Sequence, residues 1–311
     1  MTLRPALLTL ALAACAARSP SPSPSLASSC ASCHAAITAE WRSSFHRVAF
    51  TDDTFQRSLA LEEPKEHAFC TGCHAPAASR DGVGSGVDCL SCHAAPHATK
   101  PSSVATAAAS TTCAKCHEFP FDDGRPELVQ KTVTEHAASP FADVSCTQCH
   151  MPSRDGHKDH RFLSGHAPSE LARSLHVVVT RARRGSVALD AIDVTIQVDA
   201  GHAFPTGDMF RRARLVVFAE AANGRIVGDA ERVFGRTWGA MKGGPTAGRR
   251  SQLTDTRIQG TWREAIGLDD PPAPIATVRW SLVYERVVAM RGEHVSTASS
   301  DELASGELVF R

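Results

Sequence analysis

The sequence predicts an α+β chain of two domains, in which a domain of mostly short helices and loops precedes an antiparallel β-sandwich. Two observations predict this. Up to about residue 175, the 311-residue chain is rich in Ala, Ser, Pro and Gly, has few long apolar runs and contains the pattern Cys-x-x-Cys-His five times. After residue 175, apolar and polar residues alternate with a period of two, which is typical of half-buried strands. The expected boundaries are 29–175 for the first domain and 176–311 for the second.

The five motifs account for ten of the eleven cysteines. In each motif two cysteines lie one helical turn apart, so each can add across a vinyl group of one porphyrin, and the next residue can bind the iron as proximal ligand. Zinc knuckles, disulfides and thioredoxin-like sites also use Cys-x-x-Cys, but none of them needs a histidine directly after the second cysteine. The sequence therefore predicts five covalently bound c-type haems, tethered by Cys30, Cys33, Cys70, Cys73, Cys89, Cys92, Cys113, Cys116, Cys146 and Cys149, with proximal iron ligands His34, His74, His93, His117 and His150.

The first domain has too few residues per haem for a conventional side-chain core. We therefore expect the porphyrins to supply much of its apolar interior and the domain not to fold without haem. Its helices should be short segments around the cofactors. Trp41, Phe45 and Ala49 recur at helical spacing and predict a helix over Thr38–Phe50 that packs on a porphyrin.

The second domain shows the strand pattern clearly. Ile192, Val194, Ile196 and Val198 alternate with polar residues, as do Val278, Trp280, Leu282 and Tyr284. Asn223-Gly224 is a hairpin signal. Several such strands, separated by turn residues, predict a sandwich of about seven strands. No catalytic signature is evident in this domain.

The histidine count allows two histidines for every iron, because ten of the fifteen remain after the proximal ligands are assigned. The methionines are a poor alternative, since most lie in the strand-rich half or directly beside a proximal histidine. His67 is a weaker candidate, and we interpret His157, His176 and His294 as surface or structural residues. The candidate distal ligands are His46, His97, His136, His160, His166 and His202.

The N-terminus predicts export. A basic residue and a brief apolar run, too short to span a membrane, lead to Leu12-Ala13-Ala14-Cys15, which resembles a bacterial lipobox. The expected division is a lipoprotein signal peptide over 1–14, then a lipid anchor at Cys15 and a Pro/Ser tether over 15–28. The alternative is an ordinary secretory signal that is cleaved after Ala17 or nearby, so that Cys15 is removed with it. By the lipoprotein interpretation, the protein is held at the outer membrane and faces the periplasm or the cell surface.

Charge restricts the choice of partners. Lys+Arg and Asp+Glu are balanced at 33 each, so nothing suggests nucleic-acid binding or long-range attraction to a strongly charged partner. We expect redox partner proteins, either other cytochromes or a quinone-linked dehydrogenase, and a membrane reached through the lipid anchor.

Several sequence blocks together resemble the multihaem cytochrome c family that includes the tetrahaem electron acceptor of hydroxylamine oxidoreductase. The blocks are Cys30-x-x-Cys33-His34 with Trp41-x-x-Ser44-x-His46, Cys70-x-x-Cys73-His74-Ala75-Pro76, Gly86-Val87-Asp88-Cys89, Cys146-x-x-Cys149-His150-Met151-Pro152 and Gly201-His202-Ala203-Phe204-Pro205-Thr206-Gly207 with Arg211-Arg212 and, later, Asp255-Thr256-Arg257. The resemblance implies closely packed haem pairs, mostly with bis-histidine iron, and a β-rich C-terminal domain.

The sequence favours electron transfer, by hopping between mostly bis-histidine haems, over enzyme activity. One alternative is a reductase of a small nitrogen or sulfur oxyanion at one open haem. The resemblance to pentahaem nitrite reductase is weakened because that enzyme typically has Cys-x-x-Cys-Lys at its catalytic haem, whereas all five motifs here end in histidine. A second alternative is a subunit of a surface haem assembly that docks through its β domain.

Overall fold

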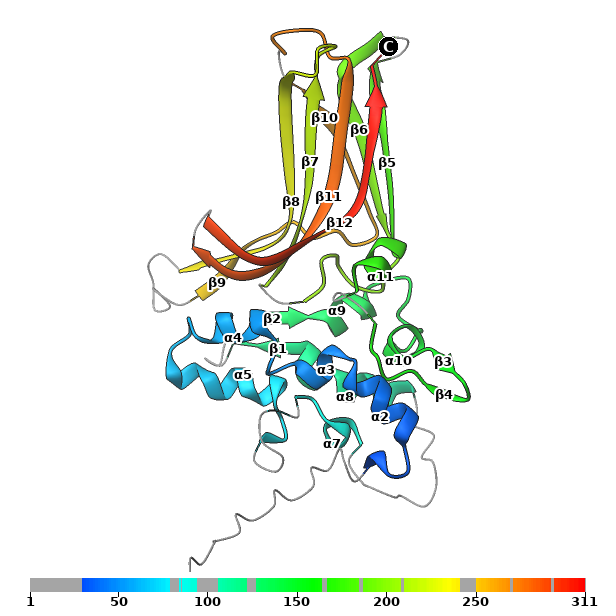
Figure 1. Cartoon of the computed structure of the whole chain (residues 1–311), viewed down its shortest axis with the longest axis vertical. Coiled ribbons are helices and arrows are strands. Elements are labelled where there is room, and N and C mark those ends of the chain that lie inside the picture. The colour runs from blue at the N-terminus through cyan, green and yellow to red at the C-terminus, as the bar shows by residue number, and fades with distance from the viewer. Residues whose placement is uncertain are drawn as a thin grey trace, which may run out of the picture.

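The computed structural model describes residues 30–78, 84, 86–93, 106–121, 127–163, 167–184, 187–207, 210–240, 250–268, 271–291 and 294–310. In Figure 1 a group of short helices lies beneath two upright β-sheets. We call the described residues up to Ser174 the helical part and those from Leu175 onward the β part. The predicted α+β class, with short helices followed by antiparallel sheets, is confirmed.

The helical part is built from short helices and two small hairpins. Because each Cys-x-x-Cys-His motif needs only one turn, the helices can be brief: the His34 amide donates to the Cys30 carbonyl at 2.9 Å, and the His93 amide donates to the Cys89 carbonyl at 2.9 Å. The elements in chain order are α2 (Ala35–Arg42), α3 (Phe45–Val48), α4 (Asp53–Leu59), η1 (Pro64–Glu66), α5 (His67–His74), α7 (Cys89–Cys92), α8 (Thr106–His117), β1 (Glu118–Pro120), β2 (Leu128–Lys131), α9 (Thr132–Ala137), α10 (Cys146–His150), β3 (Ser153–Arg154), β4 (His157–Lys158) and α11 (Pro168–Arg173).

The single helix predicted over Thr38–Phe50 is wrong, because the chain breaks between α2 and α3. Ser44 adopts an extended conformation, and its side chain accepts a hydrogen bond from the Arg47 amide, so it caps the start of α3. Its hydroxyl also donates to the Trp41 carbonyl at 2.7 Å. A serine that satisfies the free amides of a new helix favours a restart over continuation. The break gives His46 a helix of its own.

The β part contains eight described strands in two antiparallel sheets, against the seven or so predicted. The three-stranded sheet has the order β10-β6-β5 and the five-stranded sheet the order β12-β11-β7-β8-β9. The strands are β5 (Leu175–Arg184), β6 (Val187–Val198), β7 (Arg211–Glu220), β8 (Ile226–Ala240), β9 (Arg250–Asp255), β10 (Thr261–Gly267), β11 (Thr277–Arg291) and β12 (His294–Val309).

The core of the β part lies between these sheets. All four apolar residues of the alternating run on β6 are at most 3% exposed, and they pack in one cluster with Leu215, Val278 and Leu282 of the other sheet. The alternation predicted from the sequence is therefore confirmed. The predicted hairpin at Asn223-Gly224 joins β7 to β8, with Gly224 at φ +78°, which a glycine adopts without strain.

The helical part has little apolar interior of its own. Its buried hydrophobic residues, among those that the structure describes, are Trp41, Leu59, Ala75, Ala77 and Val129. No helix in the described ranges is long and apolar enough to cross a membrane.

Side chains from both parts meet at the junction. Arg236 of β8 is 2% exposed and donates to the carbonyl oxygens of Leu128 and Val129 on β2. The Ser58 hydroxyl of α4 donates to the Val288 carbonyl of β11 at 3.0 Å. These buried contacts fix how the β part sits on the helices.

Candidate haem-ligand site

The five motifs lie close together in the helical part although they are spread along the chain. Cys73 of the second motif lies beside Cys116 of the fourth. Cys89 of the third motif lies beside Cys30 of the first, and Cys113 of the fourth lies beside Cys146 of the fifth. The fold thus brings the tethering residues of different motifs into contact.

Three proximal histidines face candidate distal histidines. The ring centres of His93 and His160 are 6.3 Å apart, with 25° between the ring planes. Those of His150 and His202 are 6.1 Å apart at 11°, and those of His117 and His46 are 6.4 Å apart at 63°.

These separations fit an iron between each pair of rings. An imidazole nitrogen binds a metal at about 2 Å, so two imidazoles on opposite sides of one iron have ring centres about 6 Å apart. Rings stacked directly on each other would be closer, as shown by Phe55 and His74, whose centres are 3.8 Å apart with 12° between the planes. The donors present therefore suit bis-histidine haem iron.

In one proximal and one distal candidate histidine, the nitrogen Nδ1 hydrogen bonds to a backbone carbonyl. His74 Nδ1 donates to the Ala49 carbonyl at 2.8 Å, and His160 Nδ1 donates to the Lys158 carbonyl at 2.6 Å. A carbonyl can only accept, so Nδ1 carries the proton and the lone pair is on Nε2. Histidines that bind metals commonly donate their second nitrogen in this way, which fixes both tautomer and orientation.

His202 is oriented by a hydroxyl group. Thr206 Oγ1 lies 2.7 Å from His202 Nδ1, and the Thr206 hydroxyl donates its proton to the Ala203 carbonyl at 2.9 Å. Since that proton is used, the Thr206 oxygen accepts from the Nδ1–H of His202. The lone pair of His202 is again on Nε2.

Burial favours the neutral form of four of these histidines. Desolvation, with smaller effects of neighbouring imidazoles, lowers the pKa of His46 and of His202 to about 4. Burial also lowers the pKa of His93 and of His150. Neutral imidazole is the form that can donate a lone pair to iron.

Phe162 lies between two of the pairs. Its ring centre is 4.3 Å from that of His46 and 5.8 Å from that of His160. The residue has φ +51°, a conformation that costs a non-glycine residue about 1–3 kcal/mol and persists where the surroundings impose it. Phe162 therefore fixes the spacing between the two histidines.

The other predicted distal ligands are not brought opposite a proximal histidine by the contacts described. His136 packs on the backbone of Gly201, beside the His150–His202 pair; a Cβ atom at Gly201 would lie 2.6 Å from His136 Cδ2. His97 and His166 lie outside the described residues, as does Cys15. The three pairs therefore involve the proximal histidines of the third, fourth and fifth motifs.

The weaker candidate His67 and two histidines interpreted as surface or structural, His157 and His176, use Nε2 in other contacts. His157 Nε2 lies 3.1 Å from Glu40 Oε1, and His176 Nε2 lies 3.0 Å from Asp199 Oδ2. His67 Nε2 lies 3.3 Å from the Glu62 carbonyl. A nitrogen that hydrogen bonds to an oxygen acceptor has no lone pair for iron.

Sequence reasoning missed the residues that hold the candidate ligands. Glu40 accepts the backbone amide of His160 at 3.0 Å, and Thr206 and Phe162 act as described above. The role of Thr206 could have been predicted, because a hydroxyl four residues after His202 in a short loop lies within reach of its imidazole. Glu40 gave no signal, because its contact with His160 forms only in the folded chain.

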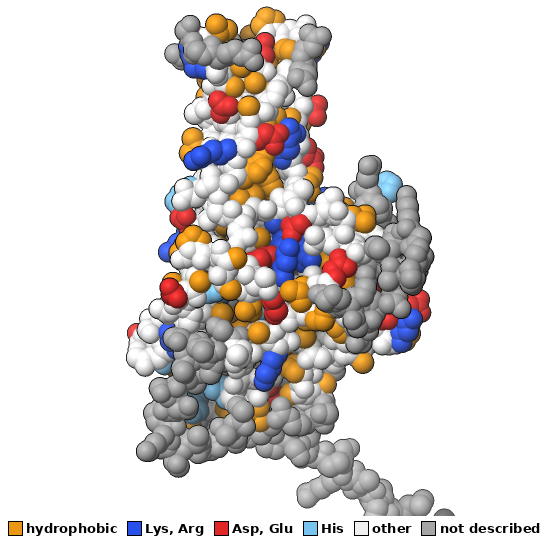
Figure 2. All heavy atoms as spheres, turned by 180° about the vertical axis from the view of Figure 1, so that it is seen from behind, with side chains coloured by type: hydrophobic (Ala, Val, Ile, Leu, Met, Phe, Trp, Pro, Cys, Tyr) orange, Lys and Arg blue, Asp and Glu red, His pale blue; other side chains and the backbone are white. Residues whose placement is uncertain are grey.

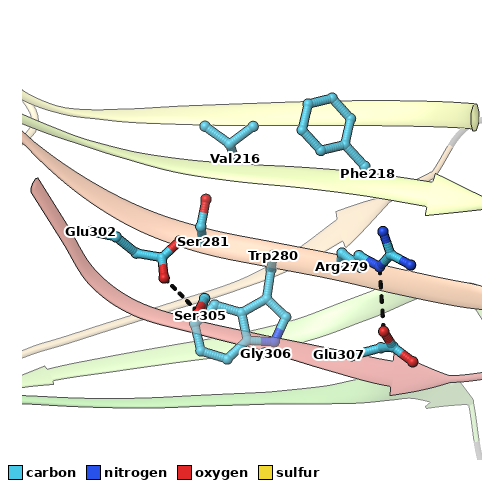
Figure 3. A pocket seen from close by; sticks show the side chains of 9 residues that line it. All are labelled: Val216, Phe218, Arg279, Trp280, Ser281, Glu302, Ser305, Gly306 and Glu307. Carbon is cyan, nitrogen blue, oxygen red and sulfur yellow. Dashed lines mark hydrogen bonds and ion pairs between the residues drawn. The ribbon is translucent and has the colours of Figure 1, made fainter. Parts of the chain in front are cut away.

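A groove of about 400 Å³ on the five-stranded sheet is unrelated to the histidines. Figure 3 shows it between β7, β11 and β12, lined by residues that include Phe218, Arg279, Trp280 and Glu307. The Trp280 ring packs over Gly306, where a Cβ atom would lie 2.8 Å from the ring. The groove contains none of the predicted site residues.

Charges of both signs are interspersed on the β part. On the face in Figure 2, basic and acidic side chains lie next to each other rather than gathering by sign. The β part contains ion pairs such as Arg214–Glu231 and Arg232–Glu264.

Comparisons with known proteins agree with the arrangement of motifs. Residues 29–94 match the family model described as cytochrome c554 and c-prime. The fold matches the crystal structure of a penta-haem cytochrome c552 from Thermochromatium tepidum, with a TM-score of 0.62 and 21% identity over 90% of this chain and 97% of that one. No curated protein sequence matches the chain. The predicted resemblance is confirmed: residues 29–94 carry the signature of the cytochrome c554 and c-prime family, and the chain has the fold of a penta-haem cytochrome c.

Proposed function

We propose that this protein carries electrons between redox partners through five c-type haems, with most irons bound by two histidines. The observation that carries the proposal is the set of three histidine pairs with ring centres 6.1 to 6.4 Å apart. When bound, the haems supply outer-sphere electron transfer. An iron with two histidines stays six-coordinate, which leaves no position for a substrate and limits structural change between oxidation states.

The contacts between cysteines support an order for the relay. Each tethering sulfur lies at the edge of its own porphyrin, so two sulfurs in contact bring two porphyrin edges together. The first motif contacts the third through Cys30 and Cys89, and the fourth contacts the second and the fifth. Cys92 of the third motif lies near Cys116 of the fourth. We infer the order first, third, fourth, fifth motif, with the second as a branch at the fourth.

The remaining histidines complete the ligand assignment. We assign His136, His97 and His166 as the candidates for the irons of the first and second motifs. Only His136 lies in the described part of the chain, at the side of the His150–His202 pair. One of these two irons is where an open position, and therefore a reductase activity, would be found.

The match of residues 29–94 to a cytochrome c family supports export. We further propose that Cys15 is lipidated and anchors the protein at the outer membrane, as its lipobox-like context suggests. A Cys15→Ser variant should move from the membrane fraction to the soluble periplasmic fraction without loss of haem. A variant that stays in the membrane fraction would contradict the anchor.

The test is an electron paramagnetic resonance spectrum of the oxidised, fully haem-loaded protein. We expect low-spin ferric signals to account for nearly all the iron. Parallel imidazole planes act on the same iron d orbital and separate the d levels, whereas planes at a large angle do so less. The pairs at 11° and 25° should therefore give ordinary rhombic signals, and the pair at 63° a more anisotropic one.

The same spectrum can contradict the proposal. A high-spin signal from one haem of the five would indicate an open iron and favour reduction of a small oxyanion there. Nitrite, hydroxylamine and sulfur oxyanions would then be tested as substrates. High-spin signals from three or more haems would contradict the histidine pairs themselves.

A further inference from the structure

The loop that carries His202 belongs to the β part but is held by the helical part. It follows β6 and is tied to the β part by two hydrogen bonds between Phe204 and Ile258, each 2.7 Å long. On its other side, the Ala203 amide donates to Glu135 Oε2 of α9 at 3.0 Å. Ala203 directly follows His202, so Glu135 fixes the backbone at the candidate ligand.

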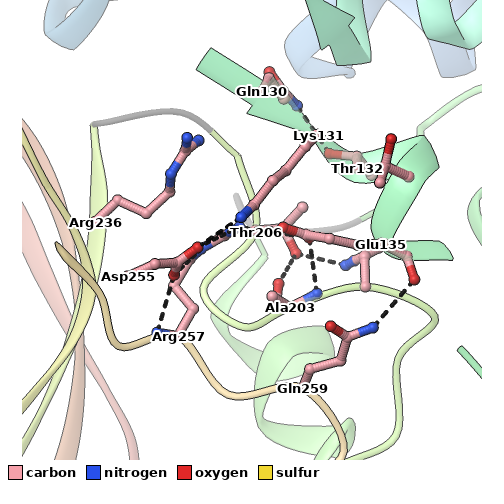
Figure 4. A network of polar contacts seen from close by, with 12 residues as sticks. Gln130, Lys131, Thr132, Glu135, Ala203, Thr206, Arg236, Asp255, Arg257 and Gln259 are labelled. Carbon is pink, nitrogen blue, oxygen red and sulfur yellow. Dashed lines mark hydrogen bonds and ion pairs between the residues drawn. The ribbon is translucent and has the colours of Figure 1, made fainter. Parts of the chain in front are cut away.

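Glu135 is held in turn by an arginine of the β part. Its carboxylate forms an ion pair with Arg257, and the two side chains are 7% and 4% exposed. Arg257 also pairs with Asp255 at 2.9 Å, and Asp255 pairs with Lys131 at 2.9 Å. The Glu135 carbonyl accepts from Gln259 Nε2 at 3.1 Å. Figure 4 shows these contacts converging where α9 meets the β part.

Such a pair is costly to bury, so its position is informative. Removing two charges from water costs about as much as their attraction returns, and an apolar pair of the same size often stabilises a fold equally well. Buried charged pairs are best attested where they fix one register or arrangement. Here the arrangement that Glu135 and Arg257 specify is the position of the His202 loop relative to the helices.

We propose that the Glu135–Arg257 pair is a positioning device that sets His202 opposite His150. Glu135 holds the Ala203 amide, and Arg257 holds the Glu135 carboxylate in the one orientation that reaches it. Thr206 then sets the rotation of the imidazole. The inference rests on the proposed function, because it takes the His150–His202 pair as iron ligands.

The test compares variants of the haem-loaded protein by carbon monoxide binding after reduction. Glu135→Leu keeps the volume but removes the acceptor for the Ala203 amide, so one haem of the five should bind carbon monoxide while covalent haem content stays unchanged. Glu135→Gln retains an acceptor oxygen for the Ala203 amide, so this variant should bind much less carbon monoxide than Glu135→Leu. Glu264→Gln makes the same chemical change at a half-buried ion pair with Arg232, away from the histidines, and this variant should bind no carbon monoxide.

A double variant guards against misfolding. If Arg257 left alone in the interior prevents folding, Glu135→Leu with Arg257→Leu removes both charges and should still open one haem. The proposal is overturned if either Leu variant loads all its haem and binds no carbon monoxide. It is also overturned if both Leu variants fail to load haem while Glu135→Gln loads all its haem and binds no carbon monoxide. A residue that only positions His202 should not be needed for covalent haem attachment.

The variant His202→Ala distinguishes the positioning role of Glu135 from the ligand role of His202. If His202→Ala opens one haem and the Glu135 variants do not, the positioning role fails and the ligand assignment stands. If His202→Ala itself leaves every haem closed, the ligand assignment fails.

Discussion

At the scale of single residues, the site depends on which nitrogen of each imidazole keeps its lone pair available for iron. Backbone carbonyls hold Nδ1 of His74 and His160, and a threonine hydroxyl holds Nδ1 of His202. Each contact leaves Nε2 unprotonated and limits rotation of the ring. The polar partners of the histidines thus prepare a ligand before any metal is bound.

Replacing His202 with Ala should give one haem of the five that binds carbon monoxide in the reduced protein, since the iron beside His150 would lose its sixth ligand. The measurement is the Soret shift on addition of carbon monoxide. His176→Ala is the matched control, because His176 is exposed and its Nε2 lies against Asp199. Equal spectra for the two variants would count against His202 as a ligand.

The sequence identified the tethering motifs and the candidate histidines, because both are local patterns. It could not identify pairs such as His93 with His160, whose members are far apart in the chain and meet only through the fold. Glu135 was unpredictable for the same reason: an acidic residue in a short helix gives no sign that it will meet an amide next to His202.

At the scale of elements, α3 is a one-turn helix that presents His46 and is fixed by the segment before the third motif. The Val87 amide donates to the His46 carbonyl at 2.8 Å, and Trp41 Nε1 donates to the Val87 carbonyl at 2.9 Å. Gly86 permits this approach: its φ is +58°, and a Cβ atom there would collide with the carbonyls of His46 and Arg47. The segment before the third motif therefore helps to hold His46, the distal candidate for the fourth motif, in place.

Gly86→Ala should displace α3, lower the stability of the protein and allow carbon monoxide to reach the iron beside His117. Positive φ alone costs an alanine about 1–2 kcal/mol, and the collision adds to this. Gly224→Ala is the control, because Gly224 has φ +78° and no atom within 4 Å of the added Cβ. Thermal unfolding and carbon monoxide binding are measured on both. If the variants lose similar stability and neither binds carbon monoxide, the close contact at Gly86 has no role in placing His46.

The predicted strands were confirmed where apolar and polar residues alternate over many positions. The predicted helix was wrong where a single side chain, that of Ser44, interrupts it. The strands of the β part follow from alternation over many residues. The helix predicted across Ser44 continued an apolar stripe, but the hydrogen bond from the Arg47 amide to the Ser44 side chain ended it. A capping serine inside an apparent stripe is a signal that hydrophobic spacing alone does not contain.

At the scale of the whole molecule, the two parts have different interiors. The β part has a continuous apolar core between its sheets, whereas the helical part buries few hydrophobic side chains among its described residues. A region with so little apolar burial cannot offset the entropy of ordering its chain. The haems are expected to supply what is missing.

Protein produced without haem should therefore retain a folded β part and lose the helical part. Limited proteolysis should cut within residues 30–174 and spare most of the segment from residue 175 onward, while circular dichroism keeps the strand signal. The haem-loaded protein, digested under the same conditions, is the control. Protection of both parts in the haem-free protein would show that the helical part is stable by itself.

The position of His202 in the chain also bears on biosynthesis. The fifth motif ends at His150, whereas its facing histidine follows β6, after the first long hairpin of the β part. A ribosome finishes the tether well before it finishes the opposing ligand. If the fifth haem is attached before the C-terminal sheets fold, its iron keeps one face open to oxygen and thiols until β6 and the loop that carries His202 are in place.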